Sequence, residues 1–274
     1  MFSKKIDFAI IISVTNANPN GDPLNGNRPR INYDGYGEMT DVCLKRKIRN
    51  RLMDDGEAIL VQSDDYRKDE HRSIKARYDA NDEIQKIAKD KDGEKKAKIA
   101  CEQWLDVRAF GQVLAGVDDA SASIAIRGPV SLQSAFSIEP VDITSSQITK
   151  SVNLVTNPKD PSKKSGDTMG MKHRVDKGIY VSYGSINRQL AEKTGFSDAD
   201  AEKLKQAILK MFENDESSAR PAGSMEVLKL IWWTHSNQTL SSAKVHRSLT
   251  VNADGTYTLA ELAGMNKPEE LDGQ

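Results

Sequence analysis

The side chains that most often carry catalysis are widely scattered in this sequence of 274 residues. The four histidines are His71, His173, His235 and His246. None of them belongs to a recognisable nucleophile or zinc motif. His235 follows two tryptophans in an apolar run, so we expect it to be a structural histidine of a strand. The two cysteines, Cys43 and Cys101, form neither a disulfide framework nor a zinc quartet.

Carboxylates offer one catalytic hypothesis. Asp22, Asp34 and Asp41 are close enough in sequence to gather a magnesium ion for phosphoryl transfer. Two glycine-containing stretches beside them, at 20–22 and 35–37, have the composition of ordinary turns, and neither matches a phosphate-binding loop. Metal-assisted cleavage of RNA therefore stays open as an alternative.

Clustered cations give a stronger indication, because phosphate recognition needs several Lys or Arg side chains on one surface. Residues 41–53 predict a helix with Thr40 as its N-cap. At about 100° per residue, Leu44, Ile48 and Leu52 form one apolar stripe. Cations border this stripe on both sides, at Lys45, Lys47, Arg49 and Arg51. Such a helix either binds polyanions or lays its lysines along the edge of a core.

A second basic segment spans residues 148–178, which we expect to be irregular. It holds seven Lys or Arg against three Asp. Met169 and Met171 lie among its glycines, threonines and cations, where a packing role is difficult to assign. Apolar side chains beside cations are suited to insertion between stacked bases.

The whole chain is nearly neutral, with 39 Lys and Arg against 40 Asp and Glu, so it is not a uniformly basic nucleic-acid-binding domain. No apolar run reaches the ~20 residues of a membrane span, and the short apolar run near the start has no cleavage site typical of a signal peptide. We therefore expect a cytosolic protein.

The order of the predicted elements defines the fold class. A strand buried on both faces covers 6–15, a long loop covers 16–39, and the cationic helix follows. Residues 54–103 are polar with helical spacing and little core content. Strand patterns then run from 123 to 143 and resume at 179–183, before a helix over 197–214 and a strand over 227–235. This order predicts an α+β fold with an RRM-like, or ferredoxin-like, βαββαβ core and two insertions.

Several stretches together resemble the CRISPR-associated backbone subunits of Cascade surveillance complexes. They are Asn18-Pro-Asn-Gly-Asp-Pro, Asn27-Arg-Pro-Arg and the stretch from Thr40 to Asn50. Two further stretches, from Thr168 to Val175 and from Leu190 to Ser197, are similar to the type I-C branch. The resemblance spans about residues 6–235.

The resemblance implies a division of the chain. An RRM-like palm would comprise 1–53 and 104–252, a helical finger insertion 54–103, and a thumb β-hairpin 148–178 within the palm. Residues 253–274 would form a C-terminal tail.

The resemblance also implies which residues bind RNA. In the loop after the first strand they are Asn18 and Asn20, and on the helix they are Lys45, Arg46, Lys47 and Arg49. At the entry to the thumb they are Gln147, Thr149 and Lys150, and in its distal part they are Thr168, Met169, Lys172 and His173. Two positions depart from the family pattern: Met171 replaces a residue that is often basic, and Asp176-Lys177 replaces Pro-Tyr.

The function implied is that of a non-catalytic scaffold without cofactor or metal. Copies would assemble head to tail along one CRISPR RNA (crRNA) and present its bases for pairing with target DNA, so that base pairing reads the sequence. The other implied partners are the end-capping guide-processing subunit, the large subunit and the small subunit of the complex. The alternatives are the metal-dependent ribonuclease and a monomeric single-stranded RNA-binding module.

Overall fold

The computed structural model describes residues 2–87, 92–114, 123–149, 156, 160, 162, 169–236 and 240–274. It is a mixed α+β fold built on an eight-stranded antiparallel sheet, with strand order β14-β11-β1-β10-β8-β4 and with β7 and β9 also paired to β10. The strands are β1 (Ile6–Ala17), β4 (Tyr36–Met39), β7 (Val130–Leu132), β8 (Ala135–Pro140), β9 (Ile143–Thr149), β10 (Met169–Ile186), β11 (Met225–Thr234) and β14 (Glu269–Asp272).

Three small hairpins and eight α-helices complete the described part of the chain. The hairpins pair β2 (Gly21–Asp22) with β3 (Arg28–Pro29), β5 (Gly111–Leu114) with β6 (Ile124–Arg127), and β12 (Leu249–Val251) with β13 (Tyr257–Leu259). The helices are α1 (Asp41–Asp54), α2 (Ile74–Asp79), α3 (Asp82–Lys86), α4 (Gly93–Gln103), α5 (Leu105–Phe110), α6 (Arg188–Thr194), α7 (Asp198–Leu209) and α8 (Ser242–His246). A short 3-10 turn, η1, spans Pro23–Asn25.

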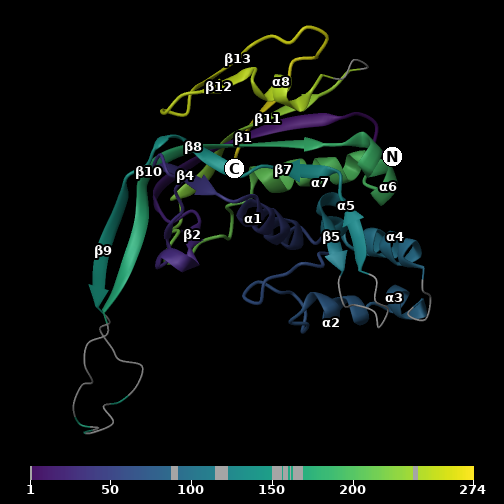
Figure 1. Cartoon of the computed structure of the whole chain (residues 1–274), viewed down its shortest axis with the longest axis horizontal. Helices are drawn as coiled ribbons and strands as arrows, with labels where there is room; N and C mark the ends of the chain where they lie inside the picture. Colours follow the sequence, from purple (N-terminus) through teal and green to yellow (C-terminus); the bar gives the residue numbers. More distant parts are fainter. Residues whose placement is uncertain are drawn as a thin grey trace.

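Strand β1 is buried on both faces, as its continuous apolar sequence predicts. One face, which includes Phe8 and Ile10, packs in the main core together with residues of α1 and α7. The opposite face, at Ala9, packs with Trp233 and Val245 beneath α8 and the β12–β13 hairpin. Figure 1 shows these two layers on opposite sides of the sheet.

The helix expected over 41–53 is confirmed as α1, and the Thr40 hydroxyl caps it by accepting from the Cys43 amide at 3.2 Å. The expected helix over 197–214 is shorter, because α7 ends at Leu209. Ser197 begins it with a capping box that includes Asp200, and this box satisfies amide groups that a helix start leaves without partners.

Strand β10 corrects the expectation that 148–178 is irregular. It begins at Met169, and its residues from Met169 to Val175 pair with β9 in the register Met169↔Thr149 to Val175↔Ile143. Pairing of β10 with β1 starts only at Val175, so residues 169–174 and β9 form a two-stranded arm that extends beyond the sheet. At about 3.3 Å per residue, six residues of β10 project by roughly 20 Å.

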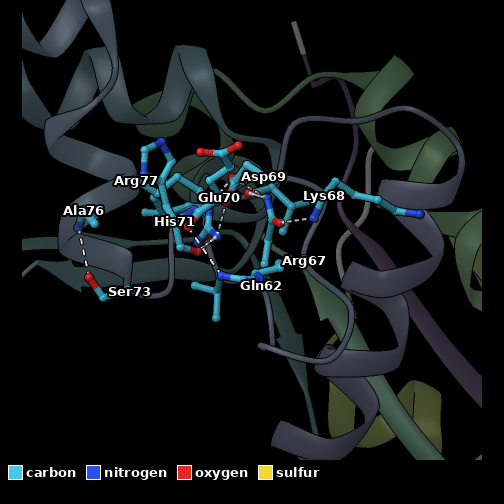
Figure 2. Close-up of polar contacts among 12 residues, drawn as sticks. Gln62, Arg67, Lys68, Asp69, Glu70, His71, Ser73, Ala76 and Arg77 are labelled. Atoms are coloured by element: carbon cyan, nitrogen blue, oxygen red, sulfur yellow. Dashed lines mark hydrogen bonds and ion pairs between the residues drawn. The ribbon is translucent and has the colours of Figure 1, made fainter.

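Residues 54–103 also differ from the expectation of a thin core. Tyr78 and Trp104 stack in a separate apolar cluster that includes Leu60, Ala100 and Ile124. In the same region the buried guanidinium of Arg77 donates to the Leu60 carbonyl at 2.7 Å and binds Asp69 through two nitrogens (Figure 2). Pairing from two nitrogens fixes the orientation of both side chains, so it holds the loop before α2 in one shape.

The end of the chain is not a separate tail. Strand β14 adds to the sheet beside β11, and Leu271 packs against the main core. The loop expected over 16–39 likewise contains short strands, because β1 continues to Ala17 and β2, β3 and β4 follow it. No helix in the described ranges is both long and apolar enough to cross a membrane.

We expect the two cysteine thiols to react at very different rates. Cys101 is 4% exposed, and burial raises the pKa of its thiol to about 11, so on the order of one thiol in a thousand is ionised at pH 8. Cys43 is partly exposed. A disulfide reagent should titrate Cys43 in the native protein and Cys101 only in denaturant. The Cys43→Ser variant is the control, and a fast-reacting thiol in that variant would contradict the burial of Cys101.

Candidate nucleic-acid interface

The loop after β1 is attached to the start of α1 through Asn20. Its side-chain oxygen accepts from both the backbone nitrogen and the hydroxyl of Thr40, each at 3.0 Å. The same hydroxyl caps α1. Asn20 therefore fixes the loop relative to the helix that carries the expected RNA-binding cations.

Asn18 has a second positioning role. Its side chain is buried, and its amide nitrogen donates at 2.7 Å to the carbonyl of Asn27, the residue before β3. Its backbone nitrogen donates to the Ala219 carbonyl at 2.8 Å. Because burial removes Asn18 from the surface, it shapes the loop from inside.

One cationic flank of α1 faces α5. Arg49 donates from Nε to Asp106 Oδ2 at 3.0 Å, and Lys45 pairs with Asp41 at 2.9 Å. The Arg49 guanidinium and the Lys45 ammonium lie 5.1 and 6.0 Å from the centre of the Phe110 ring, distances typical of cation–π contacts. The Lys45 side chain keeps 23% exposure and that of Arg49 12%, so Lys45 presents the more accessible charge of the two. Arg46, beside them, is half-buried.

Lys47, on the opposite flank of α1, corrects one of the predicted RNA-binding residues. The Lys47 side chain is fully buried and forms an ion pair with Asp215, which also accepts from Arg220 at 2.8 Å. Burial lowers the pKa of the Lys47 ammonium, while the Asp215 carboxylate opposes this shift. A buried ammonium with a protein partner is not available to a phosphate, so Lys47 does not belong to a surface interface.

The arm presents two different faces, because side chains alternate along a strand and directly opposed residues share a face. One face carries Met169, Met171 and His173 together with their opposed partners Thr149, Gln147 and Ser145. Lys172 and Arg174 lie on the other face. The structure therefore separates Lys172 from the remaining thumb residues that it describes. Lys150 and Thr168, also expected in this site, lie outside the described residues.

The arm and the loop after β1 meet at Ser145. Its hydroxyl accepts from Arg28 at 3.0 Å and lies 2.8 Å from His173 Nδ1. Strand β3, which carries Arg28, lies against β10. Arg28 and Ser145 are not among the site residues predicted from the sequence. Arg28 lies in one of the motifs that carry the family resemblance, whereas no sequence signal indicates Ser145.

Two of the three carboxylates proposed to hold magnesium have other partners. Asp22 caps η1 at Leu24 and lies 3.6 Å from Arg30, and Asp41 pairs with Lys45. Within the residues that the structure describes, no three His, Cys, Asp or Glu side chains gather as a metal site would require. His235 is buried with Nε2 2.6 Å from Asp7, as a structural histidine would be.

The candidate site is thus built on the antiparallel sheet of an α+β fold. A two-stranded arm projects from this sheet, and the loop after β1 contacts the base of the arm. The chain matches the family model described as CRISPR-associated protein Cas7 over residues 4–268. This match covers most of the sequence, and the chain belongs to that family.

Two comparisons are consistent with the family assignment. Over 231 residues the chain is 28% identical to the CRISPR-associated protein Cas7 of Haloferax volcanii, and this match covers 79% of the chain and 66%, just under two thirds, of the relative. The fold is similar to that of a chain in a solved CRISPR RNA-guided surveillance complex described as pre-nicking. The TM-score is 0.53 with 16% identity, covering 88% of this chain and 81% of that chain.

The Asp106 carboxylate should be a major source of stability. It is fully buried and accepts from the backbone nitrogens of Leu60 and Val61 as well as from Arg49. Asp106→Ala leaves these donors unpaired, and we expect a loss of about 3 kcal/mol in the free energy of unfolding, measured in urea. Asp41→Ala breaks a partly exposed pair and should cost less than about 1 kcal/mol. Equal losses in the two variants would contradict this role of Asp106.

Proposed function

We propose that this protein is a non-catalytic backbone subunit of a Cascade surveillance complex of the type I-C branch, and that it binds crRNA without reading its sequence. In this proposal the main sheet with α1 and α7 is an RRM-like palm, residues 54–103 are a finger, and the arm is a thumb. The chain order β1, α1, β8, β10, α7 and β11 supports this assignment, as does the place of the four strands in one antiparallel sheet in the spatial order β11-β1-β10-β8.

The observation that carries the proposal is the face of the arm that combines exposed apolar and polar side chains. Met169 is 65% exposed and Met171 is 55% exposed, and Gln147, Thr149 and His173 lie on the same face. Apolar side chains of this kind can insert between bases, and neighbouring polar groups can bind sugar and phosphate. Figure 1 shows the arm on one side of α1 and β2, with helices α2–α4 on the other.

The proposed interface contains fewer accessible cations than the sequence predicts. Among the described lysines and arginines of the predicted set, Lys45, Arg46 and Lys172 keep accessible charge, whereas Arg49 is largely committed to Asp106. Such a surface binds phosphates through a few contacts in each copy, and affinity then comes from the repetition of copies along one RNA.

Repetition of copies along one RNA also predicts how the copies assemble. A head-to-tail contact does not close on itself, so copies would form a helical array whose length the crRNA limits. The bases displayed between thumbs would pair with target DNA. The end-capping, large and small subunits would bind the ends and sides of this array.

The decisive experiment is to measure the mass and nucleic-acid content of the protein co-expressed with a CRISPR array, and separately with an unrelated RNA, with and without the other subunits. A particle that carries RNA of defined length and gains one copy per fixed increment of guide supports the proposal. Tight binding of short RNA by single copies would favour the monomeric RNA-binding module. Cleavage of the guide that a chelator abolishes and that Asp22→Ala removes would favour the ribonuclease.

A salt titration tests the palm and thumb cations. Each phosphate contact with single-stranded RNA contributes about 0.7 to the slope of log affinity against log salt concentration. The double variant Lys45→Gln with Lys172→Gln should therefore lower the slope by about 1.4. Lys193→Gln, an exposed lysine of α6 far from the arm in Figure 1, is the matched control and should leave the slope unchanged. An unaltered slope in the double variant would remove both lysines from the interface.

A further inference from the structure

The methionines differ widely in the exposure of their side chains. The sequence has eight, and four of them, Met39, Met53, Met211 and Met225, are buried with exposures between 0% and 8%. Met265 is half-buried. Met169 and Met171, at 65% and 55%, are the two methionines among the exposed large apolar side chains of the described residues. Both lie on the arm.

The local geometry places the two exposed thioethers side by side. They are two residues apart on one strand, so they share a face, and their direct partners across the arm are Thr149 and Gln147. The Gln147 side-chain nitrogen lies 2.8 Å from the Met169 sulfur as a donor. The surroundings of the two sulfurs are therefore polar and open to water, unlike the apolar cores that hold Met39 and Met53.

We propose that Met169 and Met171 are a paired oxidation site, at which a hydroperoxide converts both thioethers to sulfoxides and thereby switches off the apolar face of the arm. The sulfur lone pair attacks the outer peroxide oxygen, an S–O bond forms, and the O–O bond breaks. Sulfur loses two electrons and the peroxide is reduced. The proton of the transferred oxygen passes, directly or through water, to the leaving oxygen, so that the products are the sulfoxide and an alcohol or water.

Oxidation at this site changes the chemistry that the arm presents. A sulfoxide is polar and chiral, whereas the thioether is flexible and apolar. Two sulfoxides on one face would replace the part of the arm suited to insertion between bases by groups that prefer water. This consequence rests on the proposed function, but the modification itself rests on exposure and position alone. Methionine sulfoxide reductases restore the thioether, so the change is reversible.

The first measurement maps the site. The full-length protein without RNA is treated with hydrogen peroxide, and sulfoxide formation at each methionine is followed by peptide mass spectrometry. We expect Met169 and Met171 to oxidise at least about tenfold faster than Met39 and Met53, because oxidation follows exposure. Equal rates at the arm and core methionines would overturn the proposal.

The second measurement tests the switch. Oxidised wild-type protein should assemble on crRNA at least about tenfold more weakly than reduced protein, and sulfoxide reductase should restore assembly. The variant Met169→Leu with Met171→Leu has no sulfur on the arm, so its assembly after peroxide should equal that of the same variant before peroxide, whatever its starting affinity. If this variant loses assembly to the same extent as wild type, the loss comes from another site and the switch is wrong.

The two measurements separate the proposals. Fast sulfoxide formation at both arm methionines with undiminished RNA assembly would retain the modification site and overturn the switch. If reduced wild-type protein, with the other subunits present, fails to bind crRNA, the proposed function fails, while the oxidation map retains its meaning.

Discussion

The continuity of strand β10 is the constraint on which the rest of the structure depends. Its register with β1 runs without a shift from Ile6↔Ile186 to Ala17↔Val175, and its register with β9 continues from Val175 to Met169. Since the side-chain period of a strand is two residues, a slip by one position would move every side chain to the opposite face. The buried part of β10 therefore decides which face of the arm carries the methionines and which carries Lys172.

Several cations of α1 stabilise the fold through ion pairs and do not contribute to its surface. The two flanks of α1 meet carboxylates from distant parts of the chain, Asp106 for Arg49 and Asp215 for Lys47. These contacts are buried or nearly so, where removal of one partner leaves an uncompensated charge. Internal pairing leaves fewer cations of α1 available at the surface than its sequence contains.

Helix α5 connects the second apolar cluster to the main body. Its Asp106 accepts from Arg49 of α1, and its Arg108 donates to Asp200 of α7 at 2.8 and 3.2 Å. Two ion pairs with two different helices resist rotation of α5 relative to the main body better than a single ion pair would. In the proposed head-to-tail array such fixed geometry would matter, because any variation in one copy is passed to the next.

The sequence alone determined the elements whose signals are local. Continuous β-branched residues predicted β1, and the capping residues Thr40 and Ser197 predicted the starts of α1 and α7. The motifs at 18–23, 27–30 and 40–50 were sufficient for the family resemblance. Only the tertiary structure decided which cations stay accessible, because Lys45 and Lys47 look alike in sequence. Lys45 pairs with Asp41 of its own helix and keeps some exposure, whereas Lys47 is buried against Asp215 from a distant segment. Tertiary structure also decided the arm, because its polar strands lack a core pattern and are ordered by pairing with each other. It decided β14 as well, because no local pattern indicates the pairing of β14 with β11.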